Sequence, residues 1–333
     1  MLDTRRRGFA AVVCAMLCAF LPQHRAAGEG TTQAAQPASN TGSKATAVPT
    51  RDAEVERGKH LSAMLGCAYC HMAMGPHGPD FSRPLAGGFE VQERAGTWRS
   101  PNITQHKGSG IGAWTDDQIA AAIREGVRPD GTQLYPVMPY INYNRMTDQD
   151  VNALVAYLRT VPAIDNVVAP NGELKLSRPR APKPTSTPDP VDDPVKHGEY
   201  LVTIMNCSMC HTPAGKDGLP DLTRQFAGGV AIEIPMLGTG TLVASNITSD
   251  PSTGIGAWSQ AEVERAVKVP GVGGARIQSF LTGWNQMSAI DLAAIAAYLR
   301  TIPPVANAVP RSTFRMAATR ASLGAALPAR VQR

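Results

Sequence analysis

Two short stretches of this 333-residue chain repeat one arrangement of cysteine and histidine. Residues 66–71 read GCAYCH and residues 206–211 read NCSMCH, so each stretch closes a C-x-x-C pair with a histidine. Four of the six cysteines of the chain lie in these two motifs. The residues concerned are Cys67, Cys70 and His71 in the first motif and Cys207, Cys210 and His211 in the second.

A C-x-x-C pair followed at once by histidine is the attachment signature of a c-type haem. The cysteines form thioethers with the haem vinyl groups, and the histidine is the proximal ligand of the iron. A thioredoxin-like redox pair would need a βαβ setting, which the sequence does not indicate. A zinc site would need two further ligands nearby, and the second half has only one other histidine, His197. The motifs therefore predict two covalently attached haem c groups with their iron.

The N-terminus has the pattern of a secretory signal peptide. Arg5, Arg6 and Arg7 precede an apolar run over 8–21, and small residues follow at 26–28. The apolar run is shorter than the roughly 20 residues of a membrane span. We therefore expect residues 1–27 to be a cleaved signal peptide and the mature protein to lie in the periplasm.

The charge of the chain excludes one class of partner and leaves another open. The formal net charge is +5, and the sequence contains no basic patch with interleaved aromatic residues, so nucleic acid is not expected as a partner. Residues 305–333 carry five arginines and no acidic residue. We expect this basic tail to be disordered, with peripheral contact to a membrane as the alternative.

An internal repeat divides the chain into two domains. The block SPNITQHKGSGIGAWTDDQIAAAI at 100–123 matches 245–267, and DVNALVAYLRTVP at 150–162 matches 291–303. Both blocks follow a haem motif in the same order. The predicted division is a disordered linker at 28–50, a first domain at 51–165, a Pro-rich extended linker at 166–194, a second domain at 195–304, and the tail.

Each domain is predicted to contain three helices, which makes the fold class all-α. The first helix precedes the haem motif, the second begins after Trp114 or Trp258, and the third ends each repeat. Thr115 with Gln118, and Ser259 with Glu262, have the spacing of a capping box. We expect helix packing at the matched pairs Gly58 and Tyr157, and Gly198 and Tyr298. The apolar stripes of the third helices are Val151, Leu154, Val155 and Leu158, and Leu292, Ile295 and Leu299.

Together these motifs resemble the dihaem c-type cytochromes, in particular the cytochrome subunits of periplasmic alcohol, aldehyde and sugar-acid dehydrogenases. The resemblance covers both domains. It implies two tandem cytochrome c-type domains, each a small helical bundle around one haem. It also implies one-electron transfer in a respiratory chain, from a dehydrogenase to a terminal oxidase or another cytochrome.

The sixth ligand of the first iron is expected to be Met138. A soft thioether suits haem iron, and the stretch LYPVMPY places Met138 before the last helix, where the family carries its methionine. Met64, Met72 and Met74 lie too close to the attachment motif. Met146 stands at a helix start, where packing is the expected role.

The second domain departs from this pattern. Alignment of the last helices places Ser279 opposite Met138, and this loop is three residues shorter than its counterpart. The second iron has no sixth protein ligand, or Met236, Met287 or another residue supplies it. An open second haem would suit a peroxidase-like enzyme or a binder of small gas ligands, which is the alternative to a pure electron carrier.

Four further residues recur at matched positions. Trp114, Trp258, Asn102 and Asn246 could contact the haem edge, with core packing and turn formation as the alternative. His60, His77 and His106 lie outside the repeat pattern, and we expect them to be solvated.

Overall fold

The structure is a computed structural model, and it describes the central part of the chain. The expected signal peptide at 1–27 and almost all of the linker at 28–50 lie outside the described residues, as does the tail beyond residue 316. Among the described helices, none has the length and apolar character needed to cross a membrane. The described ranges are 50–76, 78–93, 96–185, 190–216, 220–233, 238–268, 271–272, 275–276 and 282–316.

The first half is built on a pair of helices. Helix α1 (Arg51–Met64) packs against α5 (Asp148–Leu158), and α3 (Asp116–Arg124) packs on α5 from another side. The short helices α2 (Cys67–Cys70) and α4 (Tyr140–Tyr143) lie between them in the chain. Two antiparallel ladders complete this half: β1 (Ala73–Gly75) with β2 (Gly78–Asp80), and β3 (Glu90–Glu93) with β4 (Gly96–Arg99).

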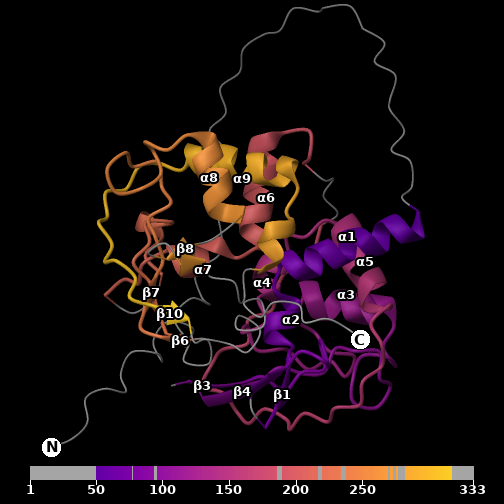
Figure 1. The fold of residues 1–333 in the computed structure, drawn as a ribbon. Helices are drawn as coiled ribbons and strands as arrows, with labels where there is room; N and C mark the ends of the chain where they lie inside the picture. Colours follow the sequence, from indigo (N-terminus) through magenta and orange to yellow (C-terminus); the bar gives the residue numbers. More distant parts are fainter. Residues whose placement is uncertain are drawn as a thin grey trace, which may run out of the picture.

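The second half repeats this order of helices. Helix α6 (Pro194–Ile204) packs against α9 (Ala289–Thr301), and α8 (Gln260–Lys268) packs on α9. Figure 1 shows α6, α8 and α9 gathered in one region and α1, α3 and α5 in another. The remaining elements are α7 (Cys207–His211), η2 (Leu222–Arg224), β5 (Ala231–Ile232), β6 (Gly238–Thr239), β7 (Leu242–Val243), β8 (Gly271–Val272), β9 (Ala275–Arg276), η3 (Thr282–Gln286) and β10 (Arg315–Met316).

A glycine lets the main helix pair of each half cross at close range. A Cβ atom at Gly58 would lie 1.8 Å from the carbonyl oxygen of Ala153, and one at Gly198 would lie 2.0 Å from that of Ala294. The Cβ atoms of Tyr157 and Tyr298 close the same notches, at 2.8 and 2.7 Å. The predicted packing role of these two pairs is confirmed.

The predicted helix starts are also confirmed. Thr115 and Gln118 form a reciprocal capping box at α3. At α8, the Glu262 amide donates to the Ser259 hydroxyl, and the Glu262 carboxylate accepts from the Ser259 amide. Thr147 caps α5.

The apolar stripes predicted for the last helices form the core. All members of both stripes are buried, and they belong to one continuous apolar cluster. Met146 is 0% exposed in this cluster, as the packing role predicted, and its counterpart Met287 is 3% exposed.

The described residues add two details to the predicted organisation. The fold is mostly helical, but the described residues also form short two-stranded ladders. The second half also continues past residue 304: Phe314 is 7% exposed, the Thr313 amide donates to the carbonyl of Thr241, and β10 pairs with β6.

The segment at 166–194 runs extended, but part of it lies along the first half. Leu174 is 4% exposed, and its amide donates to the hydroxyl of Tyr135 at 3.0 Å. The guanidinium of Arg178 stacks on the Tyr135 ring, 3.8 Å from its centroid. The hydroxyl of Tyr140 donates to the Pro179 carbonyl at 2.6 Å. The part of this segment that contains Leu174, Arg178 and Pro179 therefore packs on the surface of the first half.

Candidate haem-attachment sites

Both C-x-x-C pairs lie on a short helix that follows a sharp turn. Gly66 (φ 70°) precedes α2, and Asn206 (φ 57°) precedes α7. Glycine and asparagine are the residues that enter this left-handed conformation most readily. The turn redirects the chain after α1 and α6, so the cysteines project from a new helix axis. All four cysteines are unpaired.

Each motif histidine is oriented through one ring nitrogen. The Nδ1 atom of His71 lies 2.8 Å from the carbonyl oxygen of Pro101, and Nδ1 of His211 lies 2.7 Å from that of Ser245. A ring nitrogen that faces a carbonyl oxygen must carry the proton, which leaves the Nε2 lone pair free to bind a metal. Burial lowers the pKa of both histidines, against a smaller raising effect of the carbonyl hydrogen bond, so the rings are neutral.

A glycine-containing loop brings each of these carbonyls to its histidine. The amide of Gly87 donates to the His71 carbonyl at 2.9 Å, and the amide of Gly228 donates to the His211 carbonyl at 2.7 Å. A Cβ atom at Gly87 would lie 2.4 Å from the Pro101 carbonyl carbon, so a side chain cannot fit there. This loop was not among the predicted features, although the sequence repeats it as PLAGGF at 84–89 and QFAGGV at 225–230.

The cysteine thiols are unlike those of a redox pair. Burial raises the pKa of Cys67; burial and the neighbouring Cys67 raise the pKa of Cys70 to about 12. Burial likewise raises the pKa of Cys207 to about 12 and that of Cys210 to about 11. Redox-active cysteines have lowered pKa values. Within the described ranges, no group of three or more His, Cys, Asp or Glu side chains is arranged to hold a metal ion by itself.

Asn102 and Asn246 have the turn-forming role that was the alternative to haem contact. Asn102 Oδ1 accepts from the amide and hydroxyl of Thr104, and its Nδ2 donates to the Ile164 carbonyl at 2.8 Å. Asn246 repeats these bonds with Thr248 and Val305. Both amides are buried and tie the central loop to the segment after the last helix.

The two matched tryptophans differ in exposure. Trp114 packs against the apolar cluster, whereas Trp258 is 43% exposed. Their backbone carbonyls have the same role, since each accepts a hydrogen bond from an arginine of the last helix region, Arg159 or Arg300. Contact of either indole with a haem edge stays a prediction.

Met138 lies in the loop directly before α4, and its role as an iron ligand stays a prediction. It is partly buried, packs against the same apolar cluster as Cys67, and directly precedes Pro139, the N-cap of α4. Met64 is 2% exposed in the core of α1. Of the second-half candidates, Met287 packs in the core, while Met236 and Ser279 lie outside the described residues.

Comparisons with known proteins identify the family to which these motifs belong. The family model described as cytochrome c matches residues 55–162. The diheme cytochrome c-type protein of Cereibacter sphaeroides is 31% identical over 270 residues, which cover 76% of this chain and 87% of the relative. The chain belongs to the cytochrome c family. This cytochrome also matches the fructose dehydrogenase cytochrome subunit of Gluconobacter japonicus, with 33% identity over 84% of this chain and 57% of the relative.

A further relative is the cytochrome c subunit of the quinone-type alcohol dehydrogenase of Gluconacetobacter polyoxogenes. It is 32% identical over 281 residues, which cover 75% of this cytochrome and 56% of the relative. The chain therefore spans little more than half the length of the dehydrogenase subunits that it matches. These relatives support electron transfer as the role of the chain.

The residues present fit a covalent haem c. Each site combines unpaired thiols, a neutral imidazole whose Nε2 faces away from its carbonyl partner, and an adjoining apolar cluster. In the described part of the chain, neither Nε2 atom makes a hydrogen bond that would compete with iron.

Proposed function

We propose that this cytochrome is an exported dihaem protein that carries single electrons in the periplasm, from a dehydrogenase to a terminal oxidase or another cytochrome. The observation that carries the proposal is the duplicated histidine geometry, in which a backbone carbonyl holds Nδ1 in both halves. The names of the relatives support a dehydrogenase as the donor. Two tandem cytochrome c domains are part of the same proposal.

The roles of the chain's own residues follow from this geometry. Cys67, Cys70 and His71 would hold one haem, with the Met138 thioether as the proposed further ligand of its iron. Cys207, Cys210 and His211 would hold the other. A bound haem supplies a reversible one-electron change at iron. The protein orients the imidazole through the Pro101 and Ser245 carbonyls, which raises the basicity of Nε2, and keeps water from the apolar face.

Mass spectrometry under denaturing conditions tests the haem count. The protein matured with a c-type attachment system should carry two covalent haems, and the double variant Cys207→Ala/Cys210→Ala should carry one. The double variant should keep the absorption spectrum of the first half, because the main packing of that half, α1 and α3 on α5, is between its own helices. One haem or none in the unaltered protein would refute the proposal.

A second candidate function is binding of a small gas ligand or peroxide at the second haem. The burial of Met287 favours it, since this residue is the counterpart of Met146 and both side chains are buried in the core as packing residues. If no other residue replaces it, the second iron has an open sixth position.

Carbon monoxide decides between the two candidates. With an open second iron, about half of the ferrous haem should bind carbon monoxide at neutral pH, because a haem closed by a methionine resists the ligand. A protein that is wholly low-spin and inert to carbon monoxide would remove this second candidate and leave the electron carrier.

A further inference from the structure

Two buried aspartates occupy matching positions in the two halves. Asp150 is 1% exposed in α5, and Asp291 is 4% exposed in α9. Each accepts hydrogen bonds from the first helix of its own half. Arg57 Nε and Nη2 donate to the two Asp150 oxygens at 2.9 and 3.0 Å, and His197 Nε2 lies 2.9 Å from Asp291 Oδ1.

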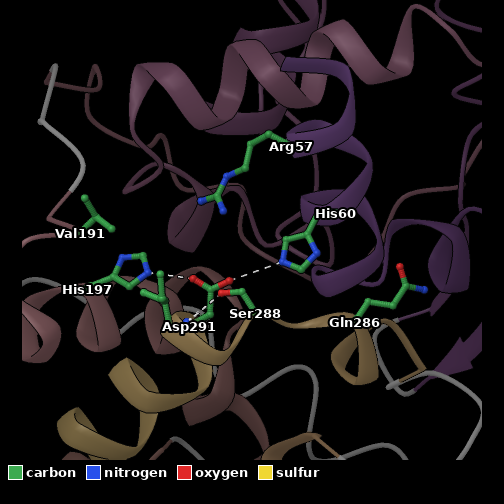
Figure 2. A pocket seen from close by; sticks show the side chains of 8 residues that line it. Arg57, His60, Val191, His197, Gln286, Ser288 and Asp291 are labelled. Carbon is green, nitrogen blue, oxygen red and sulfur yellow. Dashed lines mark hydrogen bonds and ion pairs between the residues drawn. The ribbon is translucent and has the colours of Figure 1, made fainter. Parts of the chain in front are cut away.

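The second partner of each aspartate comes from the other half. The Tyr200 hydroxyl on α6 donates to Asp150 Oδ2 at 2.7 Å, and His60 Nε2 on α1 lies 3.5 Å from Asp291 Oδ2. Figure 2 shows the Asp291 carboxylate between His197 and His60, beside a pocket of about 330 Å³. The expectation that His60 is solvated is wrong: its side chain is 21% exposed and faces Asp291. His77 lies outside the described residues.

This exchange of partners has the pattern of a two-fold interface. In such an interface one patch meets its own equivalent, so a contact from residue i to residue j recurs from j to i. His60 lies two residues after Gly58 in α1, and Tyr200 lies two residues after Gly198 in α6. Asp150 is the third residue of α5, and Asp291 is the third residue of α9. The two halves therefore face each other through equivalent surfaces.

The charge states of these groups oppose separation of the halves. Burial would raise the pKa of Asp291, but the hydrogen bond from His197 and the nearby His60 ring lower it overall, so the carboxylate is ionised. Burial and the neighbouring Asp150 carboxylate raise the pKa of Tyr200, so its hydroxyl keeps the proton that it donates. A buried carboxylate that loses a donor is left with an unmet hydrogen-bonding requirement.

A second set of contacts joins each half to the attachment segment of the other. Asn142 Nδ2 in α4 donates to the Thr203 carbonyl at 3.2 Å and to Asn206 Oδ1 at 2.7 Å, immediately before Cys207. Trp284 Nε1 in η3 donates to the Met64 carbonyl at 3.0 Å, three residues before Cys67. Gly283 permits this approach, because a Cβ atom there would lie 2.0 Å from the Ala63 carbonyl oxygen.

We propose that the two halves form a fixed, internally two-fold pair in which Asn142 and Trp284, with Tyr200 and His60, are positioning residues that hold the two haem-attachment segments at constant separation. The inference rests on the proposed dihaem function. Electron tunnelling slows steeply with distance, so a fixed separation lets an electron that enters at one half pass to the other within one molecule.

Hydrogen–deuterium exchange of the haem-loaded, full-length protein tests the pairing. The cross-half donors are removed by Asn142→Ala, Trp284→Phe, Tyr200→Phe and His60→Phe. Each of the first three variants should raise the exchange rate over residues 59–66 and 199–206 about tenfold, which corresponds to a loss of about 1.4 kcal/mol from one hydrogen bond. His60→Phe removes only the 3.5 Å contact with Asp291 and should have a smaller effect in the same direction. Tyr157→Phe is the matched control, because Tyr157 packs on Gly58 within its own half, and it should leave exchange over 199–206 unchanged.

Pulse radiolysis tests the positioning role. After rapid partial reduction, redistribution of electrons between the haems should appear as a first-order phase that is independent of protein concentration. The quadruple variant should lose this phase while each haem keeps its absorption spectrum, which shows that both halves remain folded. Unchanged exchange in all variants would overturn the pairing, and an unchanged phase in the quadruple variant would overturn the positioning role.

The outcomes separate this inference from the dihaem proposal. If mass spectrometry finds fewer than two haems in the protein without substitutions, no electron can redistribute between haems in that protein, and the dihaem proposal fails. The exchange measurement still reports whether the two halves are paired.

Discussion

Replacement of Gly58 by alanine should destabilise the first half and disturb its haem. Alanine normally stabilises the interior of a helix by about 0.5–1 kcal/mol relative to glycine. Here the new Cβ would lie 1.8 Å from the Ala153 carbonyl oxygen, where ordinary contact begins at 3.4 Å. Backbone cannot rotate out of the way, so α1 and α5 must separate.

The expected size follows from two opposing effects. Overpacking of a well-packed core costs about 1–3 kcal/mol, and the severity of this overlap places Gly58→Ala at the upper end of that range. After the helix preference of alanine is subtracted, the net loss should be about 2 kcal/mol. Because α1 ends at Met64, three residues before Cys67, the shift should also alter the potential and absorption of the first haem.

Denaturant unfolding of the haem-loaded protein, followed at the haem absorption, is the assay. Gly198→Ala should produce the same effect in the second half, where its Cβ would lie 2.0 Å from the Ala294 carbonyl oxygen. Gly172→Ala is the matched control, since nothing lies within 4 Å of that position, and it should stay within about 0.5 kcal/mol. Gly58→Ala as stable as the unaltered protein would refute the close helix crossing.

Three further outcomes are expected. Met138→Ala should abolish the weak far-red band of a methionine–ferric iron bond and lower the first potential; survival of the band would assign the ligand elsewhere. Met146→Ala should keep that band but cost about 2–5 kcal/mol in denaturant unfolding, because the side chain is 0% exposed. Burial would raise the pKa of Asp291, but the hydrogen bond from His197 and the nearby His60 ring lower it below its unfolded value. Its stabilisation is therefore complete above about pH 4 and lost as pH falls further, so Asp291→Asn should flatten the stability profile below about pH 4, and an unflattened profile would contradict this assignment.

The sequence alone predicted the features that depend on local spacing. The C-x-x-C-H motifs, the caps at Thr115 and Ser259, and the apolar stripes of α5 and α9 can all be read from residues a few positions apart. Even the notch glycines were visible, because the repeat places Gly58 and Gly198 at matched positions. Such features follow from helix periodicity and backbone chemistry, which act over one or two turns.

Only the tertiary structure decided which distant groups meet. The carbonyl of Pro101 orients His71 because a positive-φ glycine loop brings it back over thirty residues of chain. His60 showed no pattern in the sequence and was expected in solvent, yet it faces an aspartate more than two hundred residues away. Such contacts form between surfaces after the helices have packed, and the spacing of residues in the sequence does not indicate which surfaces will meet.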